Sequence, residues 1–474
     1  AEMADIFLQI EPGTDRALAL AMLHTIVRER LYDREFVQKW TVGFEKLEAH
    51  VEPFSPAWAE DKTGIPSSQI EAASRVYAAT KPALIRDGNG LDMHVGVVQT
   101  VQLVGLLTAM TGNFDVPGGN VMFPTPPLSP YPTVIPPGKP FTADQYPIFP
   151  SAPFPAVVDA LLGDRPARPR GMIVHHANPA LINGNEHKVK AAFERLEFMV
   201  VSDLFPTATA QLADLILPDT SDFERFGFQV YASAQGGFVS LQPKVVEPLG
   251  ETRSVFEVEY EVARRLGLAE CYPWKTTEEW VNFRLQPSEM TIDALKQHSF
   301  VCVTPPVAWR KYLRQSLPTP SGKAELFPVQ LAEYGYDPLP SYVEPPRLPE
   351  GLADQYPLLG TCRRPSAYVH TKFRNLPSLR EVHPEPMIRI HPRDARKRNI
   401  EDAEESVVTS PVGKVKVRAL VTDEVQPGQV CIDSGWGNPG DGLANVNALA
   451  SDEPRDRISA TTPNRRFFCE VVKA

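Results

Sequence analysis

The sequence predicts an α/β fold in which two parallel-sheet, Rossmann-like α/β domains precede a C-terminal β-barrel domain. Three observations support this prediction. Strand-like apolar runs alternate with helical segments in two separate stretches, as they do in layered α/β domains. A proline-rich stretch separates the two. Short strands of alternating polarity, divided by turns, fill the last part of the chain, which is typical of barrels.

We divide the chain of 474 residues into four parts on these grounds. Residues 1–120 form the first α/β domain, 121–155 a proline-rich connection, 156–350 the second α/β domain and 351–474 the barrel domain. A chain of this length suits roughly two to four domains. The boundary near residue 350 coincides with the run EPPRLPEGL.

The first domain begins with helical patterns. Apolar residues recur at helical spacing over residues 16–30, and residues 48–80 indicate one or two further helices. The run PALIRDGNG at 82–90 predicts a short strand that enters a glycine turn. Residues 95–110 predict a third, strongly apolar helix. It should end near Gly112, because glycine readily adopts the left-handed conformation that closes a helix.

The second domain repeats the alternation. Strands are predicted in GMIVHHANPA, EFMVVSDLF and LILP, with short helices at 185–195 and in ATAQLAD between them. Helical crossovers between successive strands imply parallel pairing. Residues 251–268 predict another helix, and residues 270–350, which are dotted with prolines, predict irregular structure. Further on, the runs YPLLGTC, ESVVTSP, GKVKVRALVT and QVCIDSG predict the strands of the barrel.

The connection contains twelve prolines between Pro124 and Pro155. Such a stretch is neither a helix nor a central strand. We expect an ordered connection that follows the surface, with a disordered linker as the alternative, because aromatic residues that could be buried are interleaved with the prolines. These aromatic residues are Phe123, Tyr131, Phe141, Tyr146, Phe149 and Phe154.

Composition excludes several classes of protein. The net charge of −10 argues against a nucleic-acid binder, since phosphate neutralisation needs a basic face. No apolar run is long enough to cross a membrane, and the first residues do not resemble a signal peptide, so we expect a cytoplasmic or periplasmic protein. The five cysteines form no CxxC pair and thus no zinc or complete iron–sulfur motif. We expect reduced, mostly buried thiols.

Candidate ligand sites follow the predicted strands, because open α/β sheets bind ligands beyond the carboxyl ends of their strands. The loops at these places are PGTD at 12–15, GNG at 88–90, Asn178–Pro179 and Ser202–Asp203. An aspartate there can accept two hydrogen bonds from a guanine edge or from ribose hydroxyls. Alternatively, Asp15 and Asp203 each cap the next helix. No GxGxxG fingerprint supports a nicotinamide cofactor.

The barrel domain carries the densest polar cluster. Cationic and hydrogen-bonding side chains of this kind suit a phosphate or a polar heterocycle, although a solvated basic loop is the alternative. The cluster consists of Thr361, Arg363, Arg364, His370, Thr371, Lys372, Arg374 and Asn375. The adjacent His175 and His176 have poor spacing for chelation. Asp219, Asp222 and Glu224 are interpreted as loop-capping carboxylates, with a metal site as the less favoured alternative.

Several characteristic segments follow one another over nearly the whole chain. They are PGTDRALALAMLHTIV, LLTAMTGNFDVPGGN, VVSDLFPTATAQLADLILPDTSDFERFG, PSGKAELF, VHTKFRNLPSLRE, NVNALASDEPRDRIS and FFCEVVK. In this order they resemble the dimethyl sulfoxide reductase family of molybdopterin oxidoreductases. The later segments are most similar to the branch that holds thiosulfate and polysulfide reductases and acetylene hydratase. The resemblance implies a molybdopterin-dependent oxidoreductase whose cofactor is bis-molybdopterin guanine dinucleotide with molybdenum or tungsten.

The resemblance also implies roles for individual residues. Gly13, Thr14 and Asp15 match a segment that holds one guanosine, and Ser202 with Asp203 matches the segment that holds the other. The other implied cofactor contacts include a cation beside a phosphate and the loops around the pterins. They are Gly90, Asn178, Arg225, Thr361, Arg363, His370, Thr371, Asn447, Arg465 and Arg466. Val255 stands at the position of another family acid.

In the family, a segment ahead of these motifs carries the iron–sulfur cysteines and the residue that ligates the metal. We therefore expect the iron–sulfur cluster on an N-terminal portion or a partner polypeptide, and we name no metal ligand, catalytic acid or base in this chain. A small-molecule substrate and an electron-transfer subunit are also implied. Two alternatives stay open: a non-redox lyase on the same scaffold, as in acetylene hydratase, and a subunit that binds pterin or nucleotide without turnover.

Overall fold

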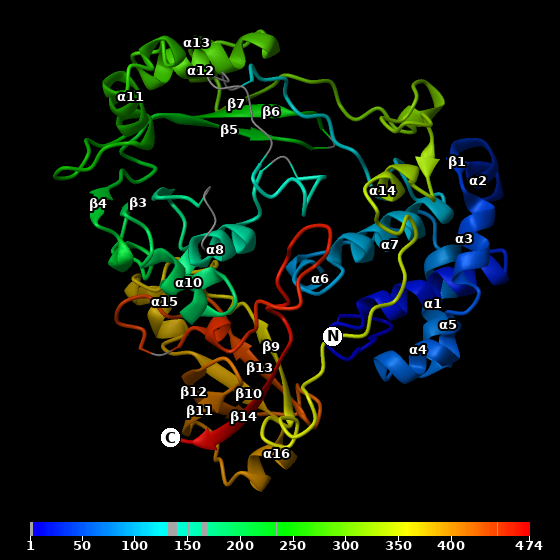
Figure 1. Ribbon diagram of the computed structural model, residues 1–474. Helices are drawn as coiled ribbons and strands as arrows, with labels where there is room; N and C mark the ends of the chain where they lie inside the picture. Colours follow the sequence, from blue (N-terminus) through cyan, green and yellow to red (C-terminus); the bar gives the residue numbers. More distant parts are fainter. Residues whose placement is uncertain (1–2, 131–139, 150, 164–167, 234, 443) are drawn as a thin grey trace.

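The computed structural model describes residues 3–130, 140–149, 151–163, 168–233, 235–442 and 444–474. Figure 1 shows a helical unit on the right, a small α/β unit on the left, an antiparallel sheet with helices at the top and a barrel at the bottom. The sheet topology confirms the predicted class, mixed α/β with parallel pairing followed by a C-terminal barrel.

The first unit consists of helices that surround α1 (Asp15–Arg28). Leu20, Leu23 and Ile26 of α1 are fully buried, since their spacing places them on one helix face. The other helices are α2 (Arg34–Trp40), α3 (Phe44–Val51), α4 (Pro56–Thr63), α5 (Ser67–Ala79), α6 (Asn89–Asp92) and α7 (Val97–Met110). The helices predicted at 16–30 and 95–110 are confirmed, and the segment predicted as one or two helices contains parts of three.

A parallel pair of short strands ties a distant segment to this unit. β1 (Thr41–Val42) pairs with β8 (Ala324–Glu325). Tyr312 and Leu326 are buried in the same hydrophobic cluster as the core residues of α1. The last part of the predicted second domain, 156–350, therefore packs on the first unit.

Residues 82–87 were predicted as a strand, and this prediction is wrong: they pair with no strand in the described part of the chain. Side-chain amides take the place of a neighbouring strand. The Oδ1 atom of Asn113 accepts a hydrogen bond from the Ala83 amide at 3.0 Å. Asn120 accepts from the Ile85 amide at 3.1 Å and donates to the Ile85 carbonyl at 2.9 Å. The segment stays extended without a ladder.

The second unit contains a parallel sheet in the order β2, β3, β4, which confirms the three predicted strands. The strands are β2 (Gly171–His175), β3 (Phe198–Asp203) and β4 (Leu215–Pro218). The helical elements are α8 (Phe154–Leu162), α9 (Pro179–Ile182), α10 (Glu186–Phe193) and η1 (Ala210–Leu212). Val174, Met199 and Val201 share one face of the sheet and pack into a cluster with residues of α8 and α10. This packing leaves the carboxyl ends of the strands free to carry the candidate loops.

An antiparallel sheet in the order β5, β6, β7 was not predicted. Its strands are β5 (Gly227–Tyr231), β6 (Phe238–Gln242) and β7 (Phe300–Cys302). The helices that accompany it are α11 (Val255–Arg265), α12 (Thr277–Leu285) and α13 (Ile292–Gln297), and α14 (Val329–Glu333) follows later. The predicted irregular segment at 270–350 is thus partly regular, whereas the helix predicted at 251–268 is confirmed. A capping box between Ser254 and Glu257 begins that helix.

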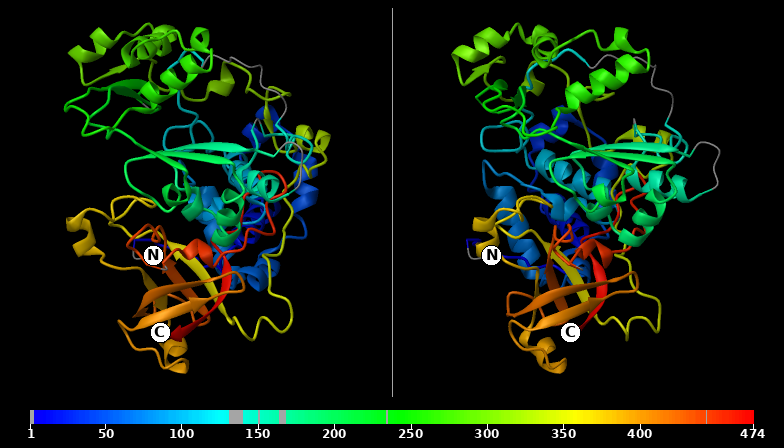
Figure 2. Two further views of the ribbon diagram at one scale, coloured as in Figure 1. Left: turned by 60° about the vertical axis from the view of Figure 1, so that its left-hand side comes forward. Right: turned by 90° about the vertical axis from the view of Figure 1, so that its left-hand side faces the viewer.

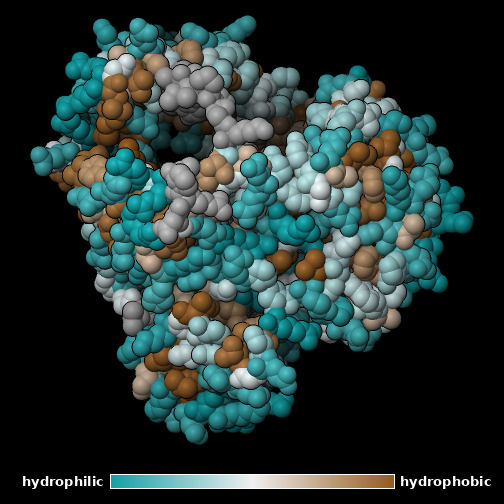
Figure 3. Space-filling view, in the orientation of Figure 1, coloured by the Kyte–Doolittle hydropathy of each residue, from teal (hydrophilic) through white to brown (hydrophobic). Residues whose placement is uncertain are grey.

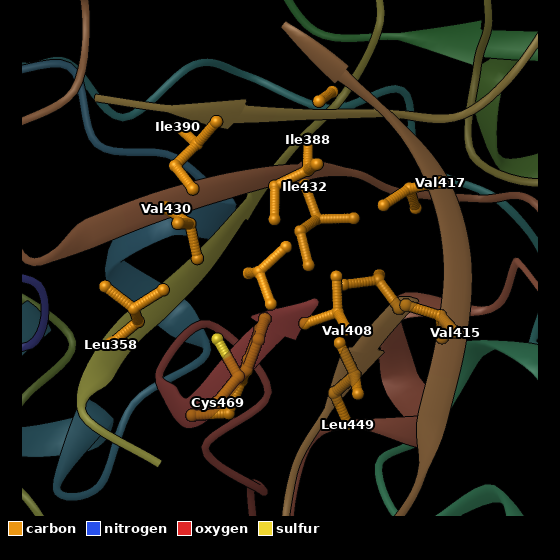
Figure 4. Packing of buried hydrophobic residues seen from close by; sticks show 14 of the residues in the cluster. Leu358, Ile388, Ile390, Val408, Val415, Val417, Val430, Ile432, Leu449 and Cys469 are labelled. Carbon is orange, nitrogen blue, oxygen red and sulfur yellow. The ribbon is translucent and has the colours of Figure 1, made fainter. Parts of the chain in front are cut away.

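Six strands close the barrel in the order β10, β12, β11, β14, β9, β13. They are β9 (Leu358–Arg363), β10 (Met387–Ile390), β11 (Glu405–Thr409), β12 (Lys414–Val421), β13 (Gln429–Asp433) and β14 (Phe467–Lys473), with α15 (Pro377–Val382) and α16 (Pro392–Lys397) between them. The four predicted strands are confirmed, and β10 and β14 are additional. Figure 4 shows Ile388, Val408 and Ile432 among the apolar side chains that fill the interior. Alternate residues of each strand point inward because the side-chain period is two.

The proline-rich connection contains no helix or strand in its described residues before α8. Tyr146 is buried against Ala156 and Ala460, which supports an ordered connection in this part. Phe123 and Phe141 are exposed, so burial does not extend to every aromatic residue of the stretch. Tyr131 lies outside the described residues.

The loop that precedes β14 joins the barrel to both units (Figures 1 and 2). The Asn185 amide donates to the Ala450 carbonyl at 2.8 Å on the side of the second unit. On the other side, Nη1 of Arg466 donates to the Pro12 carbonyl at 2.7 Å. Residues about 450 positions apart in the chain are therefore neighbours.

A charged network strengthens the contact with the second unit. Asp452 accepts from Nζ of Lys188 at 2.5 Å and from Nη2 of Arg455 at 2.8 Å. Asp159 on α8 contacts the same two cations, at 2.8 Å from Lys188 and 2.5 Å from Arg455. Burial alone would raise the pKa of Asp452. Hydrogen bonds from Lys188, Asn185 and Arg455 outweigh burial and hold this pKa at about 2.

We expect this network to weaken in acid. A carboxyl whose pKa is lowered on folding contributes stability above its unfolded pKa, near 3.8, and loses it as the pH falls toward about 2. The shift corresponds to about 2 kcal/mol. Urea unfolding of the parent and of Asp452→Asn is measured at pH values from 5 downward. The difference between their free energies of unfolding should narrow below pH 4. A difference of constant size at every pH would contradict this role.

The surface in Figure 3 is largely hydrophilic, with hydrophobic residues in separate patches. This agrees with the negative net charge and moderate apolar content of the sequence. None of the helices in the described ranges is long and apolar enough to cross a membrane.

Candidate cofactor site

Several of the residues proposed from the sequence lie at two places where the barrel domain meets the other units. The first lies between the start of α1, the loop that contains α6, and the residues just before β14. The second lies between the carboxyl ends of β2 and β3 and two loops of the barrel domain.

The turn before α1 forms one wall of the first place. Gly13 has a φ angle of +88°, a conformation that strains other residues. A Cβ atom on Gly13 would lie 3.3 Å from Nδ1 of His94 and 3.4 Å from Cδ of Arg466. Thr14 is buried, and its hydroxyl donates to the Glu11 carbonyl at 2.7 Å. The turn therefore needs glycine both for its conformation and for the close approach of two side chains.

Asp15 is the first residue of α1, and Thr14, not Asp15, holds the N-cap position. No side-chain hydrogen bond caps the helix. The Asp15 carboxyl is half-buried, and burial raises its pKa. The Asp15 carboxyl hydrogen-bonds its own backbone amide, which is not the N-cap contact of the capping alternative, and the half-buried carboxylate keeps further accepting capacity for a ligand.

Gly90 lies in α6, and no atom lies within 4 Å of the position where its Cβ would be. The ring of His94 in the same loop hydrogen-bonds the backbone of Gly90. Burial, and then the positive charges of Arg466 and Arg465, lower the pKa of His94 to about 4. His94 was not nominated from the sequence. Its signal there was its place four residues after Gly90 in a loop already considered a candidate.

Arg465 and Arg466 supply the cations of this place. Nη1 of Arg466 contacts Oε1 of Glu11 at 3.0 Å, and Nη1 of Arg465 contacts the Cys362 thiol at 2.6 Å. The Nε atoms of both arginines are buried and have no partner among the described residues. Arg466 also lines a cavity of about 310 Å³ beside residues 346–349. Buried guanidinium groups with unmet hydrogen-bonding capacity suit an anion such as a phosphate.

The second place begins at the end of β3. Ser202 is fully buried, and its hydroxyl lies 3.4 Å from Oδ2 of Asp219. Asp203 accepts the Leu204 amide at 2.7 Å, and burial raises its pKa. The loop-capping alternative thus has support at Asp203, although its half-buried carboxylate keeps further accepting capacity.

Asp219 lies at the centre of the charges around this place. It is buried, and Nε2 of His176 forms a short contact with its Oδ2 atom. Burial would raise the pKa of Asp219, but the His176 hydrogen bond and charge outweigh it and lower this pKa. Arg225 lies 3.9 Å from Asp219 and pairs with Asp222 at 2.5 Å. Arg225 is therefore held near the end of β4 by the two carboxylates.

Asn178 links this place to the barrel domain. Its Oδ1 atom accepts from the Thr209 hydroxyl at 2.7 Å, and its Nδ2 atom donates to Oδ1 of Asn438 at 2.9 Å. Asn438 in turn donates to the Thr371 carbonyl at 3.2 Å. Asn447 makes a separate link, from its Nδ2 atom to the Leu181 carbonyl at 2.9 Å. Asn438 was not predicted from the sequence, where its glycine-rich loop GWGNPGDG was the available signal.

The predicted polar cluster of the barrel separates into buried and exposed members. Arg374 is buried, stacks on Tyr368 and Trp436, and donates to the His370 and Ser434 carbonyls at 2.8 and 2.9 Å. Arg374 therefore stabilises the conformation of this loop from its buried side. The exposed members include His370, Arg364, Lys372 and Asn375.

Two further predicted residues lie on β9, at the base of that loop. Thr361 pairs with Cys431 on the parallel strand β13. Arg363 is partly exposed, and its Nε atom lies 3.7 Å from Oδ1 of the buried Asp433. The paired ends of β9 and β13 thus position Arg363 where the loop leaves the barrel.

The residues present fit a dinucleotide with anionic phosphates. At the first place the fit rests on the two unpartnered arginine Nε atoms and on the Gly13 turn, which a side chain would fill. At the second it rests on the half-buried Asp203 and on Arg225. No three His, Cys, Asp or Glu residues within the described ranges are grouped to hold a metal ion.

Comparisons with known proteins agree with this geometry. A family model described as molybdopterin oxidoreductase matches residues 1–265. A second, described as molydopterin dinucleotide binding domain, matches residues 358–467. The two matches cover both α/β regions and the barrel, which are the parts that form the two candidate places.

Several known proteins are similar over most of this chain. A probable oxidoreductase, YoaE of Bacillus subtilis, is 29% identical over 97% of this chain and 67% of its own length. Acetylene hydratase of Syntrophotalea acetylenica is 30% identical over 90% and 63%, and dimethyl sulfoxide reductase DmsA of Escherichia coli is 27% identical over 99% and 65%. The chain spans about two thirds of the length of these relatives.

The solved structure of acetylene hydratase from Pelobacter acetylenicus superposes with a TM-score of 0.89 at 26% identity, over 100% of this chain and 72% of that one. The fold, the relatives and the family models thus agree with the resemblance read from the sequence. The first model alone covers more than half of the chain, and the chain therefore belongs to the molybdopterin oxidoreductase family, in line with the predicted dimethyl sulfoxide reductase group.

Proposed function

We propose that this chain is the cofactor-binding portion of a molybdenum or tungsten oxidoreductase that uses bis-molybdopterin guanine dinucleotide. One observation carries the proposal: residues nominated in three distant segments converge at two places on the same barrel domain. Gly13 meets Arg466 at the first place, and Asn178 meets the loop of Thr371 through Asn438 at the second. Two such places suit the two halves of a bis-dinucleotide cofactor.

Each place would hold one guanosine at an aspartate. Asp15 and Asp203 are both half-buried, and burial raises the pKa of both. A guanine edge donates two hydrogens in one plane, which a carboxylate accepts in pairs. Arg466 and Arg465 would neutralise phosphate at the first place, and Arg225 at the second. Thr361, Arg363, His370 and Thr371 would cover the pterins from the barrel side.

The bound metal would supply electron-transfer or oxygen-atom-transfer chemistry, while this chain buries and orients the cofactor. We assign no metal ligand or catalytic acid to it. Thiosulfate reductase of Salmonella typhimurium, 24% identical to this chain, is described as a molybdopterin-containing subunit. By analogy we propose a small sulfur-containing or other small substrate, an electron-transfer subunit, and a polypeptide that carries the iron–sulfur cluster and metal ligand.

A second candidate is a non-redox hydratase on the same scaffold. The observation that favours it is the superposition on acetylene hydratase, with a TM-score of 0.89 over the whole chain. A third is a subunit that binds pterin or nucleotide without turnover. All three candidates share the cofactor-binding places and differ in what happens at the metal.

Metal and guanine analysis tests the shared part of the proposal. The full chain, purified from a host that makes the cofactor, should contain molybdenum or tungsten near one atom per chain, and acid hydrolysis should release about two guanines per metal. Elemental analysis by mass spectrometry and chromatography of the hydrolysate measure both. A folded chain that holds neither metal nor guanine would overturn the cofactor-binding proposal. With cofactor present, substrate reduction coupled to an artificial electron donor would separate the oxidoreductase from the hydratase, which needs no donor.

A further inference from the structure

The loop between β13 and β14 carries one side chain that joins three segments of the second place. Oδ1 of Asn438 accepts from Nδ2 of Asn178 at 2.9 Å and from the Ala208 amide at 3.2 Å. Nδ2 of Asn438 donates to the Thr371 carbonyl at 3.2 Å. A single amide therefore joins the loop after β2, the loop after β3 and the barrel loop that precedes α15.

The loops after β2 and β3 are also bound to each other. Asn178 is buried, and its Oδ1 atom accepts from the backbone amide of Thr209 at 3.1 Å and from the Thr209 hydroxyl at 2.7 Å. The same hydroxyl oxygen accepts from the Ala180 amide at 3.1 Å. Because these bonds fix one loop to the other, a contact from the barrel domain to either loop positions both.

The carboxylate of Asp441 holds the backbone of Asn438 in place. Its Oδ2 atom accepts from the amides of Gly437 and Asn438, each at 3.2 Å. Its Oδ1 atom accepts from Nη1 of Arg380, on α15, at 3.1 Å. The Asp441 side chain is almost fully buried, so water competes little for these bonds. The Asn438 loop is thus attached to the barrel loop at both ends of the segment 371–380.

Two glycines let the Asn438 loop approach its neighbours closely. Gly435 and Gly437 have φ angles of +86° and +120°, which strain other residues. A Cβ atom on Gly435 would clash with the His370 carbonyl, and one on Gly437 would lie 2.6 Å from Cδ1 of Leu181 on α9. The loop therefore fits tightly between the barrel loop and the second unit.

We propose that Asn438 is a positioning residue for one dinucleotide: its amide holds the loop after β3, which begins at Asp203, at a fixed distance from the barrel loop of Thr371. The inference rests on the proposed function, because it assumes that the second place receives one dinucleotide. In the described part of the chain, the hydrogen bonds of the Asn438 side chain all go to segments of the second place. Its loss should therefore affect one dinucleotide and spare the other.

Asn438→Ala should lower the guanine content of the purified chain by about half, because three hydrogen bonds between the walls of the second place are lost. Guanine is released by acid hydrolysis and measured relative to protein. Combination with Asp203→Ala should cause no further loss, whereas combination with Asp15→Ala should leave almost no guanine. A general loss of stability would not produce this pattern, since it would affect both places.

Asn438→Asp tests the link to the barrel loop separately. Aspartate keeps two accepting oxygens but has no amide hydrogen to donate to the Thr371 carbonyl. It should lose the same share of guanine as Asn438→Ala, yet still protect the Ala208 amide from hydrogen exchange in the chain purified without cofactor. In Asn438→Ala this amide should exchange about two- to tenfold faster than in the parent.

Asn183→Ala is the matched control. Nδ2 of Asn183 donates to the Pro179 carbonyl at 2.8 Å within its own segment, so this variant should keep the guanine content of the parent. Thermal melting shows whether each variant is folded, and if Asn438→Ala does not fold, the guanine content of Asn438→Asp decides. Full guanine content in the Asn438 variants, equal loss from both places, or unchanged exchange at Ala208 would overturn the role of Asn438 alone. A parent chain without guanine would instead overturn the proposed function.

Discussion

Replacement of either Asp15 or Asp203 with alanine should remove about half of the guanine from the purified chain. Both carboxyls are half-buried at the two candidate places. Loss of a charge-assisted hydrogen bond from one guanosine costs about 1.5–3 kcal/mol, or roughly ten- to a hundredfold in affinity. Guanine released by acid hydrolysis, relative to protein, is the measurement. The double variant should contain almost none.

Two other aspartates, one in each unit, provide matched controls for the capping alternative. Asp33 caps α2 by accepting the Phe36 amide at 2.9 Å, and Asp214 accepts the Met199 amide at 2.7 Å. Asp33→Ala and Asp214→Ala should lower stability without lowering guanine content. If Asp15→Ala and Asp203→Ala behave like these controls, the two carboxylates are structural and the guanosine assignment is wrong.

Replacing Asp433 with alanine should lower the free energy of unfolding by about 3–5 kcal/mol. This carboxylate is fully buried at the end of β13. It accepts from Nε2 of His383 at 2.7 Å, from the Met387 amide at 3.1 Å and from Nη1 of Arg389 at 3.3 Å. Without it, the Arg389 guanidinium stays buried with no internal counter-charge. Urea unfolding of the parent and the variant measures the difference.

Glu424 is the control for this effect, because it pairs with the same arginine from the surface. Its carboxylate lies 3.2 Å from Nε of Arg389 and is 65% exposed. Exposed ion pairs contribute about 0–1 kcal/mol, so Glu424→Ala should change stability little. Asp433→Ala should also free Arg363, which lies 3.7 Å away, and so reduce cofactor content. A stability loss at Asp433 no larger than that at Glu424 would show that the buried network is not needed to close the barrel.

Elements with strong local patterns were predictable from the sequence. The helices α1 and α7 and the strands β2, β3 and β4 appear where the apolar period indicated them. The strands β11 and β12 alternate because one face of each is buried in the barrel. These patterns involve residues close together in the chain, so they can be detected from the sequence without knowledge of the fold.

Other elements depended on partners far away in the chain. Residues 82–87 have a strand-like sequence but pair with the side chains of Asn113 and Asn120 instead of a strand. β8 is two residues long and exists because Thr41 lies beside Ala324. The three-residue strand β7 likewise needs β6 as a partner. Strands this short carry too few residues for a period to emerge.

The features of the candidate site also divide into those that the sequence predicts and those that depend on the tertiary structure. The sequence by itself determined the fold class, the family and the residue types that suit guanosine and phosphate, because motifs such as PGTD and VVSD are contiguous. Only the tertiary structure decided that His94 and Arg466 lie beside the Gly13 turn, and that Asn178 reaches the barrel through Asn438. It also decided that Arg374 is buried while His370 is exposed. Charges and burial act through space, and their effect on His94, Asp15 and Asp203 depends on neighbours that chain folding alone brings within a few ångströms.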